Sequence, residues 1–378
     1  MRLMATERNM IRRRKFLSAT AGAGVSFAFG FPCALAGDNA SAGAADARFV
    51  SAARVDGTDG GAIWSTEGLG EFTLPARAHA AARLRNGDRT IMVGRRPGSF
   101  AAFFDTGTPD NIQLVAPIAA HRFAGHAVAN ETHFFTGELH GESALGRIVL
   151  RDPVSGSPLE SWDAGGIEPH ELLLADSGAR LVVALGGLAE DASVKGPATN
   201  VGQIESAIVE LDAKTGRVLH RHVLAEEFSS LSLRHMALSP DGHTIAFGIQ
   251  DQDFSELKPL VGLLRVGQGI EFLELPGDDP GAMRFYIGSV AIDSSGRFLA
   301  ATSPRGGVVA LWSLSTGNYI GRVSLPDVCG LAADAEAEFF WVSSGLGDVA
   351  LLRAHEAGLA FEARWHTKTQ FDNHLTIL

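Results

Sequence analysis

Histidines occupy one repeated position in a series of short, strand-like segments of this chain. Each such residue starts an apolar stretch that leads through a tight turn into a second apolar stretch; the five are His79, His126, His170, His235 and His374. Ser289 and Cys329 start two further segments of the same kind. The chain has only 13 histidines, so five at one position is a strong bias. Because imidazole is the commonest protein ligand of Zn, Cu, Fe and Ni, the pattern predicts a transition-metal site, with Fe, Cu or Zn as the candidate ions.

A ring of seven such positions is too wide for all five imidazoles to reach one ion. We therefore expect a subset of two or three ligands, above all His126, His170 and His235. Metal binding requires neutral imidazole, so the affinity should fall as the pH drops through about 6.5. The alternative carries equal weight: these histidines line a polar channel and are satisfied by ordered water or by neighbouring backbone.

Other polar side chains near the same segments predict a funnel that binds a small ligand. They are Arg95, Arg96, His121, Glu168, Arg234, Tyr286, Arg305, Cys329 and Asn373. Guanidinium groups clamp anions such as carboxylates. A carboxylate such as that of Glu168 can complete a metal shell or orient an imidazole ring.

Known catalytic signatures are missing from the sequence. It contains no C-x-x-C-H motif, which argues against covalently attached haem, and neither H-E-x-x-H nor G-x-S-x-G. Its glycine pairs match no phosphate-binding loop. The sequence therefore predicts no particular reaction. A metal-dependent hydrolase or oxidoreductase that uses the channel histidines and a scaffold that docks a partner protein remain alternatives to a binding protein.

The repeat itself indicates the fold that brings these residues together. The repeated segments start 40 to 65 residues apart, and each is followed by two more strand-like stretches, as at Arg147, Ala207 and Val309. Four short strands per repeat are typical of a β-propeller blade. The innermost strand of each blade lines the central channel, so the repeated residues should meet there.

The last repeat is incomplete, because only four residues follow His374. The missing three strands are predicted at the other end of the chain, in residues 48–55, 60–66 and 71–75. We therefore expect an all-β, seven-bladed propeller over residues 46–378, closed by N- and C-terminal strands that share one blade. Such closure removes the open sheet edge that would otherwise template aggregation.

Residues 1–36 predict an export signal. Arg13 and Arg14, followed by Lys15, Phe16 and Leu17, resemble a twin-arginine signal, and small residues up to Ala36 fit a cleavage site. The apolar run is short and is broken by Pro32, so no membrane-spanning segment is expected after processing. We expect export by the Tat translocase, a short lead over residues 37–45, and a periplasmic location.

The charge of the mature chain excludes one class of partner. Removing the leader's six basic residues and one acid leaves 26 basic against 42 acidic residues, a net charge of −16. Nucleic-acid binding needs clustered Lys and Arg, so no nucleic-acid partner is expected.

Seven short motifs follow one another along the chain, at Arg95–Gly98, Gly165–Leu172, Leu231–Ala237, Tyr286–Ala291, Thr302–Gly307, Asp327–Gly330 and Asp372–Leu375. Together and in this order, they make the chain resemble the DUF1513 family of Tat-exported bacterial proteins. The resemblance implies a seven-bladed propeller. Members often neighbour genes for imelysin-like and di-haem oxidase-like periplasmic proteins, which implies a role in iron acquisition or handling with periplasmic iron-uptake proteins as partners. It implies no reaction.

Overall fold

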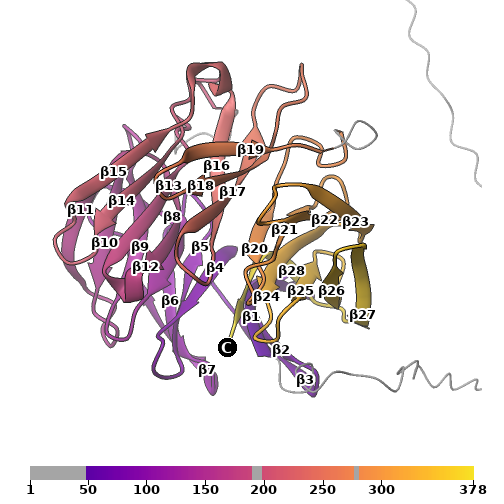
Figure 1. Cartoon of the computed structure of the whole chain (residues 1–378). Helices are drawn as coiled ribbons and strands as arrows, with labels where there is room; N and C mark the ends of the chain where they lie inside the picture. The colour runs from indigo at the N-terminus through magenta and orange to yellow at the C-terminus, as the bar shows by residue number, and fades with distance from the viewer. Residues whose placement is uncertain (1–47, 190–197, 276–280) are drawn as a thin grey trace, which may run out of the picture. The chain divides into compact units, whose positions relative to one another are not determined.

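The computed structural model describes residues 48–189, 198–275 and 281–378, which form strands joined by short turns (Figure 1). The predicted signal sequence and lead lie outside the described residues. Within the described ranges, no helix is long and apolar enough to span a membrane. The helical elements there are two single 3-10 turns, η2 (Asp176–Gly178) and η3 (Glu226–Phe228).

The strands form seven antiparallel, four-stranded sheets, which we number as blades 1 to 7 from the inner strand of each. Blade 1 contains β4 (Ala78–Arg83), β5 (Arg89–Gly94), β6 (Ala101–Asp105) and β7 (Thr108–Val115). Blade 2 contains β8 (His121–Ala129), β9 (Phe134–His140), β10 (Leu145–Arg151) and β11 (Pro158–Ile167). Blade 3 contains β12 (Pro169–Ala175), β13 (Arg180–Leu185), β14 (Ala207–Asp212) and β15 (Val218–Val223).

The remaining blades complete the propeller. Blade 4 contains β16 (Leu231–Leu238), β17 (Thr244–Asp251), β18 (Val261–Arg265) and β19 (Gly269–Leu273), and blade 5 contains β20 (Ser289–Ile292), β21 (Phe298–Ser303), β22 (Val308–Ser313) and β23 (Tyr319–Ser324). Blade 6 contains β24 (Val328–Ala333), β25 (Phe339–Ser344), β26 (Asp348–His355) and β27 (Gly358–His366). Blade 7 contains the C-terminal strand β28 (Gln370–Ile377) together with β1 (Arg48–Val55), β2 (Thr58–Ser65) and β3 (Gly68–Thr73).

The position of a strand in its blade explains its sequence. The middle strands pack on a neighbouring blade through both faces, so β5 and β6 are almost continuously apolar and buried. The outermost strand β7 mixes exposed and partly buried residues, because it lies at the rim of the blade. The hydrophobic core is therefore divided into layers between adjacent blades.

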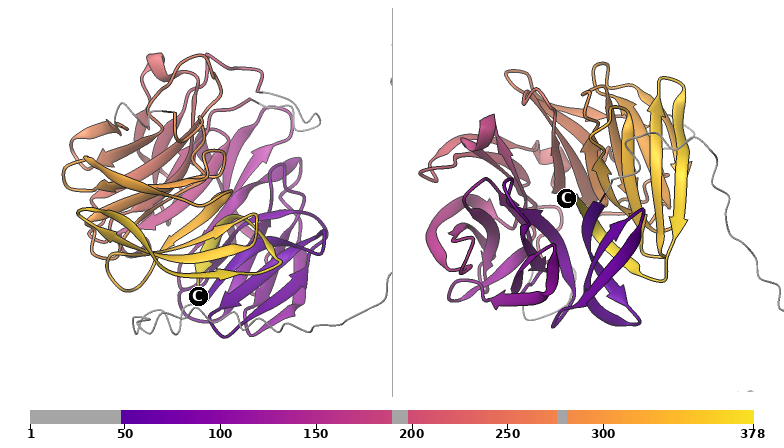
Figure 2. Two further views of the ribbon diagram at one scale, coloured as in Figure 1. Left: turned by 90° about the vertical axis from the view of Figure 1, so that its right-hand side faces the viewer. Right: turned by 90° about the horizontal axis from the view of Figure 1, so that it is seen from below.

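Closure of the ring follows the sequence prediction. The C-terminal strand β28 pairs antiparallel with β1, and Phe49, Val50 and Ser51 lie opposite Ile377, Thr376 and Leu375. The view from below in Figure 2 shows the C-terminus beside the indigo strands at the start of the described chain. The inner strands β4, β8, β12, β16, β20, β24 and β28 contact one another in this order, and β28 also contacts β4. The seven-bladed propeller with a shared closing blade is thus confirmed.

An aromatic cluster packs the closing blade against blade 6. Phe49 stacks on Trp64 with ring centroids 5.2 Å apart. The Trp64 ring also lies 5.4 Å from Trp341 and 5.2 Å from Trp365. Trp64 is 3% exposed, so its side chain contributes almost its full burial energy to the contact between the two blades.

This packing predicts the effect of truncating Trp64. Trp64→Ala leaves a large cavity between blades 6 and 7 and should lower the free energy of unfolding by about 3–5 kcal/mol. Leu69 pairs with Trp64 across β2 and β3 but is 37% exposed, so Leu69→Ala serves as the control and should cost about 1 kcal/mol or less. Urea unfolding followed by tryptophan fluorescence and circular dichroism measures both; equal losses would contradict this account of the closing contact.

Candidate metal centre

The inner strands are bulged where the repeated residues lie. Register shifts interrupt six of the seven inner strands, at Ala78/Ala80, Phe123/Ala127, Pro169/Leu172, Leu233/His235, Val328/Gly330 and opposite Ser51/Ala53 in β28; the pairing of β20 has none. A β-bulge leaves residues unpaired and turns their side chains away from the regular alternation. Five of these bulges lie at or beside the cluster histidines, and the sixth lies at Cys329.

The five histidines form one closed cluster of imidazole rings. Ring centroids around the cluster lie 4.9 Å apart for His79–His126, 4.9 Å for His126–His170, 5.2 Å for His170–His235, 4.7 Å for His235–His374 and 4.7 Å for His374–His79. The rings of His235 and His374 meet although two blades separate them in the propeller. Their strands therefore surround a narrow centre, and the cluster is tighter than a ring of seven evenly spaced positions would be.

Gly125 makes this close approach achievable for His126. Its φ is +109°, a backbone conformation that side chains other than glycine rarely adopt. A Cβ at this position would lie 2.9 Å from Cδ2 of His79. The chain therefore needs glycine here both for the backbone turn and for the contact between the two rings.

Burial favours the neutral form of four of the five cluster histidines. His79, His126, His170 and His235 are at most 7% exposed, and His374 is partly buried. Burial lowers the pKa of His79 to about 4, although Asp372 opposes this shift. Burial, with smaller contributions from neighbouring positive groups, lowers the pKa values of His126, His170 and His374 well below the usual 6.5. These four imidazoles therefore take up a proton only at a pH below the value of about 6.5 expected from unperturbed imidazoles.

Two groups of three histidines bring ring nitrogens close to one another. One ring nitrogen each from His79, His126 and His374 lies within 4.8 Å of the others, and so does one each from His126, His170 and His235. His126 belongs to both groups. Nε2 of His126, Nε2 of His374 and both ring nitrogens of His235 are buried without a hydrogen-bond partner among the described residues. The expected set of His126, His170 and His235 is one of these two groups.

Glu171 is a neighbour of the cluster that sequence reasoning missed. Its Oε1 lies 3.9 Å from Nδ1 of His126, and its Oε2 lies 3.4 Å from Nδ1 of His235. Glu171 also accepts a hydrogen bond from the backbone N–H of Met236. In a regular strand Glu171 and His170 would point to opposite faces, but the bulge between Pro169 and Leu172 removes that alternation.

The predicted ligand residues Glu168, Arg96 and Arg234 form a buried ionic group beside the cluster. The Glu168 carboxylate is 1% exposed and pairs with both guanidinium groups. It also accepts a hydrogen bond of 3.0 Å from the backbone N–H of Leu188. Arg234 in turn contacts the cluster, because its Nη1 lies 3.2 Å from Nδ1 of His170.

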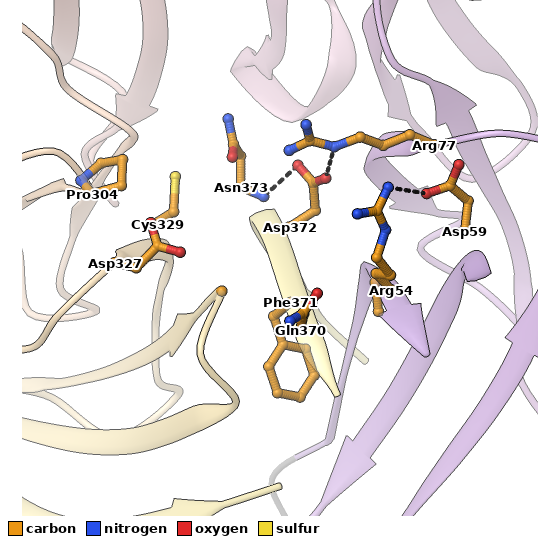
Figure 3. A pocket seen from close by; sticks show the side chains of 12 residues that line it. Arg54, Asp59, Arg77, Pro304, Asp327, Cys329, Gln370, Phe371, Asp372 and Asn373 are labelled. Atoms are coloured by element: carbon orange, nitrogen blue, oxygen red, sulfur yellow. Dashed lines mark hydrogen bonds and ion pairs between the residues drawn. The ribbon is translucent and has the colours of Figure 1, made fainter. Parts of the chain in front are cut away.

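Cys329 and Asn373 line a pocket of about 240 Å³ (Figure 3). Arg77 and Asp372 form an ion pair in this pocket, and Asp327 lies across it beside Cys329. Burial opposes ionisation of Asp372, but His79 and Arg77 outweigh it and lower the pKa of Asp372 to about 2. Burial also raises the pKa of the Cys329 thiol well above its usual value, so this cysteine is protonated.

The other predicted ligand residues are not members of either group of three histidines. Arg305 stacks over Tyr286, with its guanidinium carbon 4.5 Å from the ring centroid. His121 packs against His140 with ring centroids 5.3 Å apart, and its Nδ1 lies 2.7 Å from the carbonyl oxygen of Ala119. Arg95 is exposed just after β5, and its positive charge helps to lower the pKa of His79. The structure therefore brings together the five histidines and the Glu168 group, but not His121.

Acid should destabilise the metal-free protein through the neutral histidines. A folded-state pKa below the unfolded value of 6.5 leaves stability intact above pH 6.5 and removes it as the pH falls towards 4. At pH 5, about 1.5 units below the unfolded-state pKa of 6.5, His79 alone accounts for about 2 kcal/mol of lost stability, because each pH unit in this interval costs about 1.36 kcal/mol. His79→Gln should lose correspondingly less between pH 7.5 and 5, whereas exposed His243→Gln should behave as wild type. Urea unfolding with a chelator present tests this; equal stability of the wild type at both pH values contradicts it.

Comparisons with known proteins agree with this fold. No curated protein sequence matches the chain. Among solved structures, a chain of hydrazine synthase from Kuenenia stuttgartiensis superposes with a TM-score of 0.60 at 15% sequence identity, over 82% of this chain and 93% of that chain. At this identity the similarity shows the fold alone.

The family comparison covers nearly all of the propeller. The model of the family described as "Protein of unknown function (DUF1513)" matches residues 72–378, a range that includes all five clustered histidines and Glu171. It also includes the buried Glu168 group. The chain therefore belongs to the DUF1513 family.

Proposed function

We propose that this protein binds a transition-metal ion in the histidine cluster at the centre of its propeller. The observation that carries the proposal is the convergence of five largely buried imidazoles, in which ring nitrogens of His126, His235 and His374 have no hydrogen-bond partner within the described part of the chain. A buried polar atom without a partner costs about 1–3 kcal/mol, so several together are unusual in a folded protein. A metal ion satisfies them at once, because each neutral imidazole offers a lone pair.

The chemistry of the donors indicates which ions suit the site. An all-imidazole set fits Cu, Zn, Fe and Ni, and the general order of affinities places Cu²⁺ first and Fe²⁺ below Zn²⁺. In vitro we therefore expect Cu²⁺ and Zn²⁺ to bind more tightly than Fe²⁺. Which ion is bound in the cell depends on metal supply and on the partner that delivers it.

The cellular role is the further part of the proposal. The twin-arginine leader supports export to the periplasm, and the family resemblance supports a role in iron acquisition or handling together with periplasmic iron-uptake proteins. Iron bound in the cluster would be the physiological metal in that setting. The funnel residues Arg95, Arg305 and Tyr286 would then face an anionic ligand or a partner.

Removing His126 should have the largest effect on metal binding, because it belongs to both groups of three. Loss of one ligand of three should weaken Zn²⁺ binding on the order of a hundredfold or more in His126→Ala. His220→Ala is the matched control, since His220 lies in a surface groove with His222 and His243 and should leave the affinity unchanged. Calorimetric titration of demetallated protein at pH 7.5 measures both.

The same titration at pH 6 adds a second test. Because burial lowers the pKa values of His79, His126, His170 and His374, wild-type affinity at pH 6 should stay within about threefold of its value at pH 7.5. Exposed histidines would instead be largely protonated by then. Metal binding that survives in His126→Ala but is lost in His220→Ala would place the ion on the surface and refute the proposal.

A further inference from the structure

We propose that Glu171 is the counter-charge of the metal centre. Its carboxylate lies behind two of the cluster histidines, keeps their ring protons on the side away from the ion, and balances part of the ion's positive charge. Glu171 is thus a positioning residue and not a ligand. The inference rests on the proposed function, because it assigns a role beside the same cluster.

Each carboxylate oxygen of Glu171 faces one imidazole of the cluster. Oε1 lies 3.9 Å from Nδ1 of His126, and Oε2 lies 3.4 Å from Nδ1 of His235. Both distances are in the range of ion pairs and exceed those of ordinary hydrogen bonds. Neither of the two groups that could hold an ion includes Glu171. The carboxylate therefore lies behind candidate ligands and not among them.

The backbone fixes the carboxylate in this position. Oε2 of Glu171 accepts a hydrogen bond of 2.7 Å from the N–H of Met236. Met236 follows His235 in β16, whereas Glu171 follows His170 in β12, so this contact links the inner strands of blades 3 and 4. The side chain of Glu171 is only 20% exposed. Its negative charge is therefore held largely away from solvent, next to the rings.

Glu171 lacks the compensation that a nearby buried carboxylate has. Glu168 pairs with two arginines, whereas the ion-pair partners of Glu171 in the described ranges are the two cluster histidines alone. A cavity of about 100 Å³ adjoins Glu171 and the rings of His126 and His235, and none of the described residues that line it is a lysine or an arginine.

This unbalanced charge points to a cation. Ionised carboxylates inside proteins are normally paired with a positive group or lie close to a metal. The histidines cannot be that positive group while they ligate an ion, because ligation requires neutral imidazole. A divalent ion in the cluster supplies the missing positive charge.

The position of Glu171 also favours one tautomer of both rings. A negative charge beside Nδ1 attracts the ring proton to that nitrogen and leaves the lone pair on Nε2. Nε2 of His126 and Nε2 of His235 are both buried without a hydrogen-bond partner within the described ranges. Since His126 belongs to both groups of three, Glu171 acts on the ion whichever group holds it.

The tautomers can be observed in the wild-type protein without any metal. Nitrogen-15 NMR of histidine-labelled, metal-free protein at pH 7.5 distinguishes Nδ1–H from Nε2–H imidazoles by chemical shift. We expect both His126 and His235 as Nδ1–H tautomers. Either ring protonated on Nε2 instead would overturn the inference without bearing on metal binding.

Removing the charge of Glu171 should weaken metal binding. Glu171→Gln keeps the size of the side chain but not its charge, and should lower Zn²⁺ affinity about 10- to 100-fold, the usual loss when a partner behind a ligating histidine is removed. Glu171→Asp keeps the charge and should bind Zn²⁺ more tightly than Glu171→Gln. Calorimetric titration of demetallated protein at pH 7.5 measures both variants.

Glu210→Gln is the matched control for loss of a buried carboxylate. Glu210 lies in the same blade, its side chain is 8% exposed, and its Oε1 lies 3.1 Å from Nε2 of His222, a histidine outside the cluster. Its replacement should leave Zn²⁺ affinity within about threefold of the wild type. Thermal unfolding of each variant separates a loss of affinity from a loss of fold.

The possible results separate this inference from the proposed function. If Glu171→Gln binds Zn²⁺ as tightly as the wild type, or Glu171→Asp no more tightly than Glu171→Gln, the inference fails alone. A loss in Glu171→Asp as severe as in His126→Ala would make Glu171 a ligand and overturn the role assigned to it. If the wild type binds no Zn²⁺, the inference and the proposed function fail together.

Discussion

Five imidazole rings packed together at the meeting point of the inner strands are the constraint on which the rest of this structure depends. The rings lie 4.7 to 5.2 Å from their neighbours around the cluster, and burial keeps four of them from taking up a proton near neutral pH. Two protonated rings at such distances would repel strongly in a medium of low dielectric constant. The cluster is therefore built for neutral histidine, the form that ligates a metal.

The surroundings of the cluster fit that requirement. Inner strands bulge at the histidines, which frees these side chains from strand alternation and turns them towards one another. Glu171 and Ser289 lie behind Nδ1 of three rings, whereas Arg234 lies behind that of His170 alone. Closure of the ring by β28 supplies both His374 and Asp372, so the strand that completes the fold also completes the site.

The sequence predicts the frame of this protein well and the details of the site less well. Regular spacing of strand pairs identifies seven blades, and the unpaired strand after His374 identifies the shared closing blade, because both depend on local turn and strand patterns. The same frame predicts that five histidines meet. It cannot predict bulges, since these depend on how the inner strands of neighbouring blades pack.

The missed and misplaced residues follow from that limit. Glu171 next to His170 is expected on the opposite face of a regular strand, yet the bulge brings its carboxylate to the rings of His126 and His235. His121 lies five residues before His126, but in the structure it packs against His140 at 5.3 Å. Ser289 looks like a mere substitute for histidine in the repeat, whereas its hydroxyl orients His374.

Anomalous diffraction from a crystal of the Co²⁺-loaded protein, collected at the cobalt edge, tests the central claim most directly. The account predicts one strong anomalous peak at the centre of the propeller, about 2.0–2.2 Å from a ring nitrogen of His126 and from ring nitrogens of the other two histidines in one of its two groups of three. A peak confined to the surface groove at His220, His222 and His243, or no ordered peak in fully loaded protein, would contradict a metal centre in the histidine cluster.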